Sequence, residues 1–425
     1  MLLEFSVSNF RSIKNEQILS MLAESSQAKP DNMASVELSA GGYLSVLKSA
    51  VIYGANASGK TNIIKAFFTC ISFIQRSATN IVGDAITCYD PFIFEQTTAS
   101  SPIVFKLMFI GKDNIKYSYQ FSYNRYEIIS EILEYYPKGQ RATLFTRTNS
   151  EGETTHSHVI SLTKNVTNQR IKKEVFKNQL YLSQFGSTIV HEQLTEVYLF
   201  FKNIDVWNSQ NSVYTKNMQE KLSSDLLDPR NEALRKRLVK LIQISDTKIE
   251  DIRISKEPGS DKVRPQKGEY ALFGQHSLFE NDKKIGNKEL PFREESAGSN
   301  VLFAIGGYIL KKLETGGVMF IDELDNSLHP KLTKFLVKLF NNPISNPKNA
   351  QLVCATHEVT LLDKDMFRMD QVWFTEKNKF GASELYSIKD FDGVREGIPF
   401  DKWYHNGKFG GEPKIREIEF IFGDE

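Results

Sequence analysis

Four residues with fixed spacing near the start of the chain could hold a phosphate group. Gly54, Gly59, Lys60 and Thr61 fit the pattern G-x-x-x-x-G-K-[ST] in the stretch GANASGKT. The backbone amides of such a loop surround a phosphate, the lysine reaches the terminal phosphates of a nucleotide, and the threonine hydroxyl is a ligand for Mg²⁺. The residues that we predict to contact the nucleotide are Gly54, Ala55, Asn56, Ala57, Ser58, Gly59, Lys60, Thr61 and Asn62.

A pair of carboxylates far along the chain could bind the metal and activate water. Residues 318–321 form an apolar run typical of a buried strand, and Asp322 and Glu323 follow it directly in GGVMFIDELDNSLHP. Open α/β sheets bind ligands at the carboxyl ends of their strands. In this Walker B arrangement Asp322 would bind Mg²⁺, and Glu323 would orient the water that attacks the γ-phosphate. Such a pair can instead cap the next helix, but the glycine loop favours the first interpretation.

Two further stretches could contribute to the same site. AQLVCATHE predicts a buried strand that ends just before His357, whose imidazole could contact a γ-phosphate. FREESAGSN precedes an apolar helical run, so Ser296 and Gly298 lie at a predicted helix N-terminus. That position is an ordinary helix cap and also an anion site.

The glycine loop needs a strand before it and a helix after it. The apolar residues 47–53 predict that strand, and the spacing over residues 61–75 predicts the helix. Alternation over residues 2–13 predicts a first strand. Between Pro91 and Pro137, the runs PIVFKLMFI and KYSYQFSY predict a hairpin in an antiparallel β-layer, which continues with a strand at residues 130–136.

The middle of the chain has a different character. Residues 187–244 contain apolar residues at helical spacing, which predicts a helical insertion. Residues 146–169 are polar and predict a loop or a weak hairpin. Residues 259–288 are also polar, and Gly268, Gly274 and Gly286 predict turns there.

Composition excludes some classes of protein. The chain has 425 residues, and 53 Lys and Arg against 52 Asp and Glu give a net charge of +1, so a nucleic-acid contact would need a local patch. Cys70, Cys88 and Cys354 lack the spacing of a metal site or a disulfide framework. The N-terminus lacks a signal-peptide pattern, and VLFAIGGYIL is about half of the ~20 residues that span a membrane. We expect a cytoplasmic protein without a membrane partner.

In this order the motifs resemble the ABC-type ATPase heads of the RecF, SMC and OLD group. The resemblance extends to FSVSNFRSIK, ESAGS, DELDNSLHP and HNGKFGGEP, and is strongest to stand-alone OLD-like ATPases (the RloA and AbiL kind) of bacterial abortive-infection and phage-defence operons. It implies an α/β fold, a P-loop NTPase head of ABC type with a mixed central sheet, an antiparallel β-layer and a helical insertion. The head would comprise residues 1–186 and 246–425, and the insertion residues 187–245.

The resemblance also implies roles for individual residues. Arg11 would lie near the nucleotide, Asp325 would belong to the D-loop, and His357 would assist catalysis. Ser296 and Gly298 match the signature motif by position, although its usual leucine and double glycine are absent. Gln96 is the candidate for the Q-loop glutamine.

The same resemblance implies cofactors and partners. ATP with Mg²⁺ would join two copies head to tail, in a homodimer or a higher oligomer, with ATP on one copy covered by Ser296 and Gly298 of the other. The effector would be a separate chain, a Toprim-type or RloB-like nuclease, because the residues after His357 look like edge and closing strands of the sheet.

Three alternatives remain open from the sequence. A RecF-like DNA-repair ATPase would share every nucleotide-site residue, with the basic stretch RNEALRKRLVKL (230–241) as its DNA surface. A transporter ATP-binding subunit would need a fuller signature motif. A scaffold that binds ATP without hydrolysis would not depend on Glu323.

Overall fold

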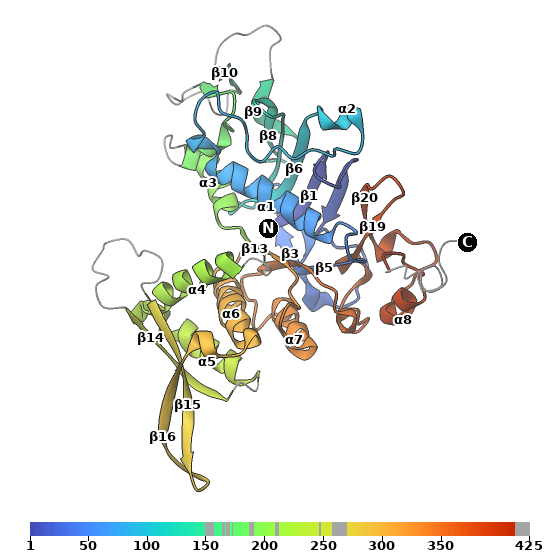
Figure 1. Ribbon diagram of the computed structural model, residues 1–425. Coiled ribbons are helices and arrows are strands. Elements are labelled where there is room, and N and C mark those ends of the chain that lie inside the picture. The colour runs from blue at the N-terminus through green and yellow to red at the C-terminus, as the bar shows by residue number, and fades with distance from the viewer. Residues whose placement is uncertain are drawn as a thin grey trace. The chain divides into compact units, whose positions relative to one another are not determined.

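A computed structural model describes residues 1–148, 157–163, 166, 171, 173–186, 191–208, 212–245, 248–256 and 270–412 (Figure 1). The chain divides into two compact units. The first unit contains Met1–Val206, Gly317–Phe320 and Gln351–Glu425, and the second contains Trp207–Gly316 and Ile321–Ala350. The predicted boundaries at residues 186 and 245 stay a prediction.

The glycine loop belongs to a six-stranded sheet with the order β13-β17-β18-β5-β19-β20. Strands β18 and β19 pair in parallel with β5, whereas β20 pairs antiparallel with β19, so the sheet is mixed. All five residues of β5 and of β18 are buried, as their apolar runs predict. The strands are β5 (Ser49–Tyr53), β13 (Asp205–Asn208), β17 (Val318–Asp322), β18 (Gln351–Ala355), β19 (Val372–Lys377) and β20 (Ser383–Ser387).

A second, seven-stranded sheet is antiparallel throughout, in the order β11-β9-β8-β7-β6-β1-β2. The predicted hairpin is present as β6 and β7, and the predicted next strand is β8. The first strand is shorter than predicted, because Asn9 and Arg11 have positive φ angles and turn the chain. The strands are β1 (Leu2–Ser8), β2 (Gln17–Ser20), β6 (Ile103–Ile110), β7 (Lys116–Tyr123), β8 (Ile128–Tyr135), β9 (Ala142–Thr148) and β11 (Ser161–Leu162).

Helix α1 (Lys60–Arg76) follows the glycine loop and contacts both sheets. The ring of Phe67 stacks on Phe320 of β17, with ring centroids 3.5 Å apart, and meets Phe5 of β1 edge to face at 5.0 Å. Apolar residues of both sheets and of this helix form one buried core. The helix is therefore fixed along its apolar face, and its N-terminus is held at the loop.

The remaining elements of the first unit are small. They are β3 (Met33–Glu37) paired with β4 (Tyr43–Leu47), β10 (Ser157–Val159) paired with β12 (Glu174–Phe176), and the helices α2 (Gln96–Ala99), α3 (Glu192–Lys202) and α8 (Phe400–His405). The 3₁₀ helices of both units are η1 (Pro30–Asn32), η2 (Ser77–Thr79), η3 (Leu182–Gly186), η4 (Pro229–Asn231), η5 (Phe292–Glu294), η6 (Val359–Leu361), η7 (Met369–Gln371) and η8 (Ile388–Asp390). Within residues 146–169, the described part contains β10, β11 and the end of β9.

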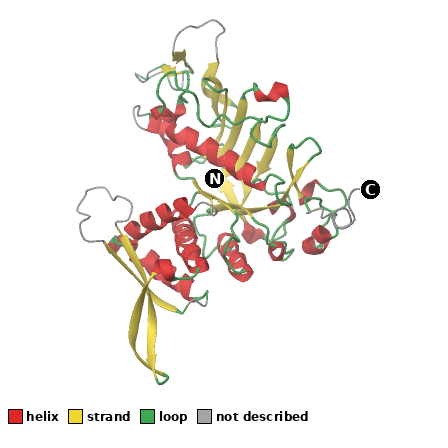
Figure 2. Ribbon diagram, in the orientation of Figure 1, coloured by secondary structure: helices red, strands yellow, loops and turns green. Residues whose placement is uncertain are grey.

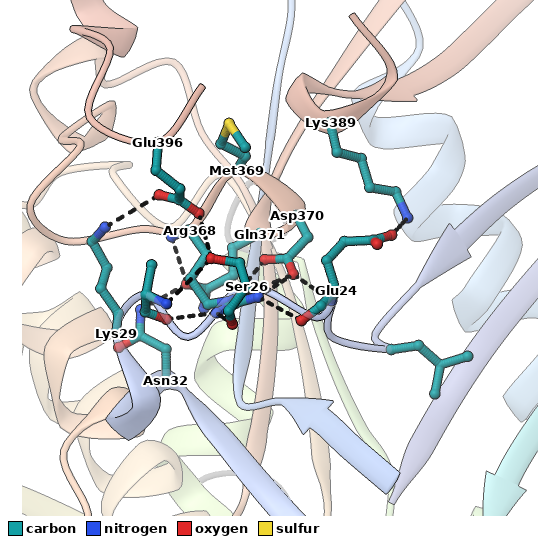
Figure 3. Close-up of polar contacts among 12 residues, drawn as sticks. Glu24, Ser26, Lys29, Asn32, Arg368, Met369, Asp370, Gln371, Lys389 and Glu396 are labelled. Carbon is teal, nitrogen blue, oxygen red and sulfur yellow. Dashed lines mark hydrogen bonds and ion pairs between the residues drawn. The ribbon is translucent and has the colours of Figure 1, made fainter. Parts of the chain in front are cut away.

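A buried arginine fastens the segment before β3 to the turn before β19 (Figure 3). Arg368 is fully buried and binds the carboxylate of Asp370 through Nε and Nη2, at 2.9 and 2.8 Å. The same carboxylate accepts a hydrogen bond from the backbone of Glu24 at 2.8 Å. The remaining guanidinium donors bind the carbonyl oxygens of Glu24, Ser26 and Ala28.

Gln371 links this cluster to the central sheet. Its amide nitrogen donates to the carbonyl of Ser49 at 2.9 Å, and its amide oxygen accepts from Asn32 at 2.6 Å. At the margin of the cluster, Lys389 pairs with Glu24 at 2.9 Å (Figure 3). The start of β5 is therefore fixed by a satisfied polar network.

The second unit combines helices with a three-stranded antiparallel sheet (Figure 2). Helix α6 packs closely on its neighbours, because a β-carbon at Gly307 would lie 2.3 Å from Leu222 and one at Gly306 would lie 2.7 Å from Leu241. The elements are α4 (Ser212–Leu226), α5 (Glu232–Gln243), β14 (Ile249–Lys256), β15 (Tyr270–Glu280), β16 (Lys283–Pro291), α6 (Ala297–Thr315) and α7 (Pro330–Asn341).

The prediction of turns in residues 259–288 is wrong for the part that the structure describes. Residues from Tyr270 onward form the hairpin β15–β16, in which Gly274 pairs with Leu290 and Gly286 pairs with Leu278. A β-carbon at Gly274 would lie 2.8 Å from the Glu295 carboxylate, so this glycine makes room for a side chain. Gly268 lies outside the described residues.

Candidate nucleotide-binding site

The glycine loop has a backbone that requires glycine at both fixed positions. Gly54 and Gly59 have φ angles of 153° and 124°. A β-carbon at Gly54 would lie 2.5 Å from the carbonyl oxygen of Thr375, and one at Gly59 would lie 2.2 Å from Ser383 Oγ. The motif thus reflects both backbone conformation and close contact with β19 and β20.

Lys60 is folded back over the loop. It is the first residue of α1, and its side chain is buried. Its ammonium donates to the carbonyl oxygen of Gly54 at 2.7 Å and to that of Ala55 at 3.1 Å. The charge is therefore held where the loop surrounds an anion, beside the positive end of the helix dipole. Thr61 is the next residue of the same helix.

Hydroxyl groups from distant parts of the chain form hydrogen bonds with the loop and with the first turn of α1. Ser58 Oγ lies 2.6 Å from Thr375 Oγ1, and the carbonyl of Ser58 accepts from Ser383 Oγ at 2.7 Å. Ser12 Oγ accepts from the amide of Asn62 at 2.6 Å and lies 2.8 Å from Ser383 Oγ. The sequence alone does not indicate Ser12, Thr375 and Ser383, because serine and threonine in strands and turns form no recognisable pattern.

The start of the loop also contacts a glycine turn near the end of the described chain. A β-carbon at Gly411 would lie 3.6 Å from the α-carbon of Gly54. The carbonyl of Gly411 accepts from the hydroxyl of Tyr404, whose ring stacks on Phe374 at 5.5 Å. The described part of the stretch HNGKFGGEP, residues 405–412, is therefore part of the surroundings of the loop.

His357 lies at the same edge of the central sheet as the glycine loop. Ala355 of β18 pairs in parallel with Ile52 of β5, and each strand ends within one residue of that pair. Both strands then lead into a predicted site residue, Gly54 in one case and His357 in the other. The side chain of His357 is exposed at this edge.

Arg11 lies in the turn after β1, and Gln96 begins the short helix α2 before β6. Arg11 forms an ion pair with Asp90 at 3.0 Å, and its backbone amide donates to the carbonyl of Asp90 at 2.8 Å. Gln96 is exposed at the first position of α2. The role of Arg11 beside the nucleotide and that of Gln96 in a Q-loop stay predictions.

The acidic residues of the second motif follow β17. Asp322 is buried as the last residue of that strand. Glu323 has a φ angle of 53°, in the left-handed region that is uncommon for residues other than glycine. Such a backbone conformation persists only where the surrounding structure holds it in place. Asp325 accepts a backbone hydrogen bond from Leu328 within the same turn.

Within the second unit, the signature-like stretch packs on the turn that contains Asp325. Ser296 caps α6, because its Oγ accepts from the backbone amide of Ser299 at 3.0 Å. A β-carbon at Gly298 would lie 2.8 Å from the carbonyl oxygen of Ser327. The structure therefore brings Ser296 and Gly298 together with the residues that follow Asp325.

The structure gathers the predicted site residues in two groups. Residues 54–62 and His357 lie at one sheet edge of the first unit, and Ser296, Gly298 and Asp325 lie together in the second. Lys60 belongs to the first unit and Asp322 and Glu323 to the second, and their meeting stays a prediction.

The predicted metal ligands suit Mg²⁺. No group of three or more His, Cys, Asp or Glu side chains positioned for a metal occurs among the residues that the structure describes. Mg²⁺ in nucleotide sites uses few protein ligands together with phosphate oxygens and water. Thr61 and Asp322 provide a hydroxyl and a carboxylate of that kind.

A comparison with protein families identifies the family to which the chain belongs. A family model described as "AAA domain, putative AbiEii toxin, Type IV TA system" matches residues 49–363, well over half of the chain. The chain belongs to this family. The matched range begins at β5, includes the glycine loop and the residues after β17, and extends past His357. Family and loop geometry together make this AAA-family protein a P-loop protein of the ATPase type. No curated protein matches the chain.

Solved structures with similar folds have different roles. A structure titled as an SmcHead bound to the C-winged helix domain of ScpA is 12% identical, with a TM-score of 0.46 and coverage of 91% of this chain and 97% of that one. The recombination mediator protein RecF is 12% identical, with a TM-score of 0.37 and coverage of 91% and 98%. CbiO1 from Clostridium perfringens, part of an ABC transporter complex, is 11% identical, with a TM-score of 0.30 and coverage of 90% and 88%. These likenesses do not decide between such roles.

Helix α5 contains most of the basic stretch (230–241) that the sequence offers as a DNA surface. Arg235 pairs with Asp251 at 3.2 Å, Arg237 with Glu314 at 2.6 Å, and Lys236 with Glu232 at 3.6 Å. These ion pairs neutralise much of the charge that would attract a phosphate backbone. Across the described residues, no helix is both long and apolar enough to span a membrane.

Proposed function

We propose that this AAA-family protein is an ABC-type ATPase that binds and hydrolyses Mg²⁺-ATP and acts as a molecular switch for a separate effector. The observation that carries the proposal is the geometry of the loop GANASGKT. Its two glycines adopt conformations closed to other residues, and Lys60 is held over the loop carbonyls. Such a loop presents amides and a cation to a triphosphate.

Each residue of the site then has a task in hydrolysis. Lys60 and the loop amides would bind the phosphates, and Thr61 and Asp322 would hold the metal. When bound, Mg²⁺ would supply positive charge beside the phosphate oxygens. Glu323 orients the attacking water and accepts its proton, while His357 contacts the γ-phosphate.

A dimer would convert the state of the nucleotide into a change of assembly. The N-terminus of α6, with Ser296 and Gly298, would cover the ATP bound to the loop of a second copy. A γ-phosphate held between two helix N-termini favours the closed dimer over the open one, and only such a difference in affinity can drive a switch. ATP would close the dimer, and hydrolysis would open it.

The effector is proposed to be a nuclease, Toprim-type or RloB-like, in anti-phage defence. Two features support this role: the resemblance to stand-alone OLD-like ATPases and the family description, which names an AbiEii toxin of a Type IV TA system. A RecF-like role in DNA repair is the alternative. The ion pairs on α5 count against it, and ATP turnover stimulated by DNA and suppressed by salt would favour it.

The switch can be tested with the Glu323→Gln variant of the full chain. We expect this variant to bind Mg²⁺-ATP, to turn it over about 100-fold more slowly, and to accumulate as an ATP-dependent dimer in light scattering. Glu314→Gln, at an exposed position of α6, is the control and should behave as the wild type. Unchanged turnover in Glu323→Gln would contradict the proposal.

A further inference from the structure

One peptide group of the glycine loop is held by a residue outside the loop. The carbonyl of Ser58 accepts a hydrogen bond from the hydroxyl of Ser383 on β20, at 2.7 Å. Ser58 and Ser383 are 4% and 2% exposed, so water has little access to this bond. Ser383 lies beyond residues 49–363, the range that the family model matches.

The direction of that carbonyl fixes the direction of an amide. In a trans peptide the C=O and the N–H point in opposite directions, so the Gly59 amide points away from Ser383. Gly59 has a φ angle of 124° and no side chain to resist rotation of this peptide. If the peptide rotated, a carbonyl oxygen would replace an amide on the side of the loop that faces the phosphates.

We propose that Ser383 is a positioning residue that locks the Ser58–Gly59 peptide, with its amide directed toward the bound phosphate. This inference rests on the proposed function, because it assigns Ser383 a task in nucleotide binding. The residue does not contact the nucleotide. It acts through the backbone of the loop.

Neighbouring groups hold Ser383 in place. Its backbone amide donates to the carbonyl of Ser12 at 2.7 Å, and its hydroxyl lies 2.8 Å from Ser12 Oγ. Ser12 Oγ also accepts from the side chain of Asn62, within the first turn of α1. These hydrogen bonds connect the turn after β1, the glycine loop and the edge strand β20 of the central sheet.

The side chain of Ser58 makes a separate contact with a neighbouring strand. Ser58 Oγ lies 2.6 Å from Thr375 Oγ1 on β19, and both hydroxyls are buried. Ser58 is therefore held by its side chain on one strand and by its carbonyl on the next. Only the hydrogen bond from Ser383 to the Ser58 carbonyl controls the direction of the Gly59 amide.

The experiment measures binding of the ATP analogue AMP-PNP with Mg²⁺ by calorimetry, and the melting temperature, for the full chain. Ser383→Ala removes the hydrogen bond to the Ser58 carbonyl. Ser387→Ala is the matched control: Ser387 is a buried serine of the same strand, whose hydroxyl donates to the carbonyl of Met369 at 3.2 Å, away from the loop. We expect Ser383→Ala to weaken binding about fivefold or more, from the loss of one hydrogen bond, and Ser387→Ala to bind as the wild type. The two variants should melt at similar temperatures.

Ser383→Cys keeps a weak donor at the same position and should lose less affinity than Ser383→Ala. It also serves if the alanine variant does not fold. Equal affinity in Ser383→Ala and the wild type, or equal losses in Ser383→Ala and Ser387→Ala, would overturn the inference. Failure of the wild type itself to bind AMP-PNP would instead overturn the proposed function.

Discussion

Gly59 shows at the scale of one residue why the motif needs glycine. A methyl group there would meet Ser383 Oγ at 2.2 Å, in addition to the cost of a φ angle of 124°. We expect Gly59→Ala to abolish nucleotide binding and to lower the melting temperature. The control is Gly83→Ala, where φ is 84° and no atom lies within 4 Å of the new group. It should cost about 1 to 2 kcal/mol from the backbone alone and should keep binding. Binding by Gly59→Ala would contradict the described loop geometry.

His158 gives a prediction about pH. Burial, and then the charges of Arg147 and Lys177, lower the pKa of His158 from 6.5 to about 4. Its Nδ1 accepts from Arg147 Nε at 3.0 Å, which requires the neutral ring. In the unfolded chain this residue takes up its proton at a higher pH than in the folded chain. Its contribution to stability is therefore complete above pH 6.5 and is lost as the pH falls toward 4.

The variant His158→Asn tests this, since the asparagine Oδ1 takes the place of Nδ1 and can accept from Arg147 but cannot become charged. We expect the wild type to lose about 1 to 3 kcal/mol more stability than the variant between pH 7 and pH 4. Melting temperatures measured across this range give the comparison. Parallel pH profiles would show that His158 has an ordinary pKa in the folded chain.

The predictability of the site also differs from residue to residue. The spacing of Gly54, Gly59 and Lys60 was sufficient to place the loop between a strand and a helix, because the backbone at these positions tolerates few alternatives. Thr375 and Ser383 contribute single hydroxyls that only the sheet order brings to the loop. Local sequence contains no trace of such contacts.

At the scale of elements, the cluster of Arg368 fixes the segment between β2 and β3. Arg368→Met would leave Asp370 buried without its partner and free three carbonyls, at a cost of about 3 to 5 kcal/mol. Hydrogen exchange of residues 24–32 measures the effect, and we expect opening to become at least about 100-fold more frequent. Lys389→Met removes the partially exposed pair with Glu24 and should change exchange little. Equal protection in both variants would contradict the proposed anchoring.

Elements with clear periodicity could be predicted, and those without it could not. The buried strand β5, helix α1 and hairpin β6–β7 follow from continuous, helical and alternating apolar patterns. The hairpin β15–β16 was missed because most of its side chains are at least partly exposed, including Leu278 and Phe279. Both of its faces can be polar, so its sequence resembles that of a loop.

At the scale of the whole molecule, the mixed central sheet, the antiparallel sheet and the AAA family agree with the predicted α/β fold. The division into two units did not follow from the sequence, because residues 317–320 return to the first unit between two segments of the second. Contacts of this kind depend on the order of strands, which periodicity does not determine.

The proposed ATPase activity is tested most directly by steady-state release of phosphate from Mg²⁺-ATP. The purified full chain is compared with its Lys60→Ala and Lys65→Ala variants. Both lysines belong to α1, but only Lys60 bonds the loop carbonyls. The proposed ATPase function predicts turnover that requires Mg²⁺, is retained in Lys65→Ala and falls at least about 100-fold in Lys60→Ala. Turnover that is equal in the two variants, or absent from the wild type, would contradict it.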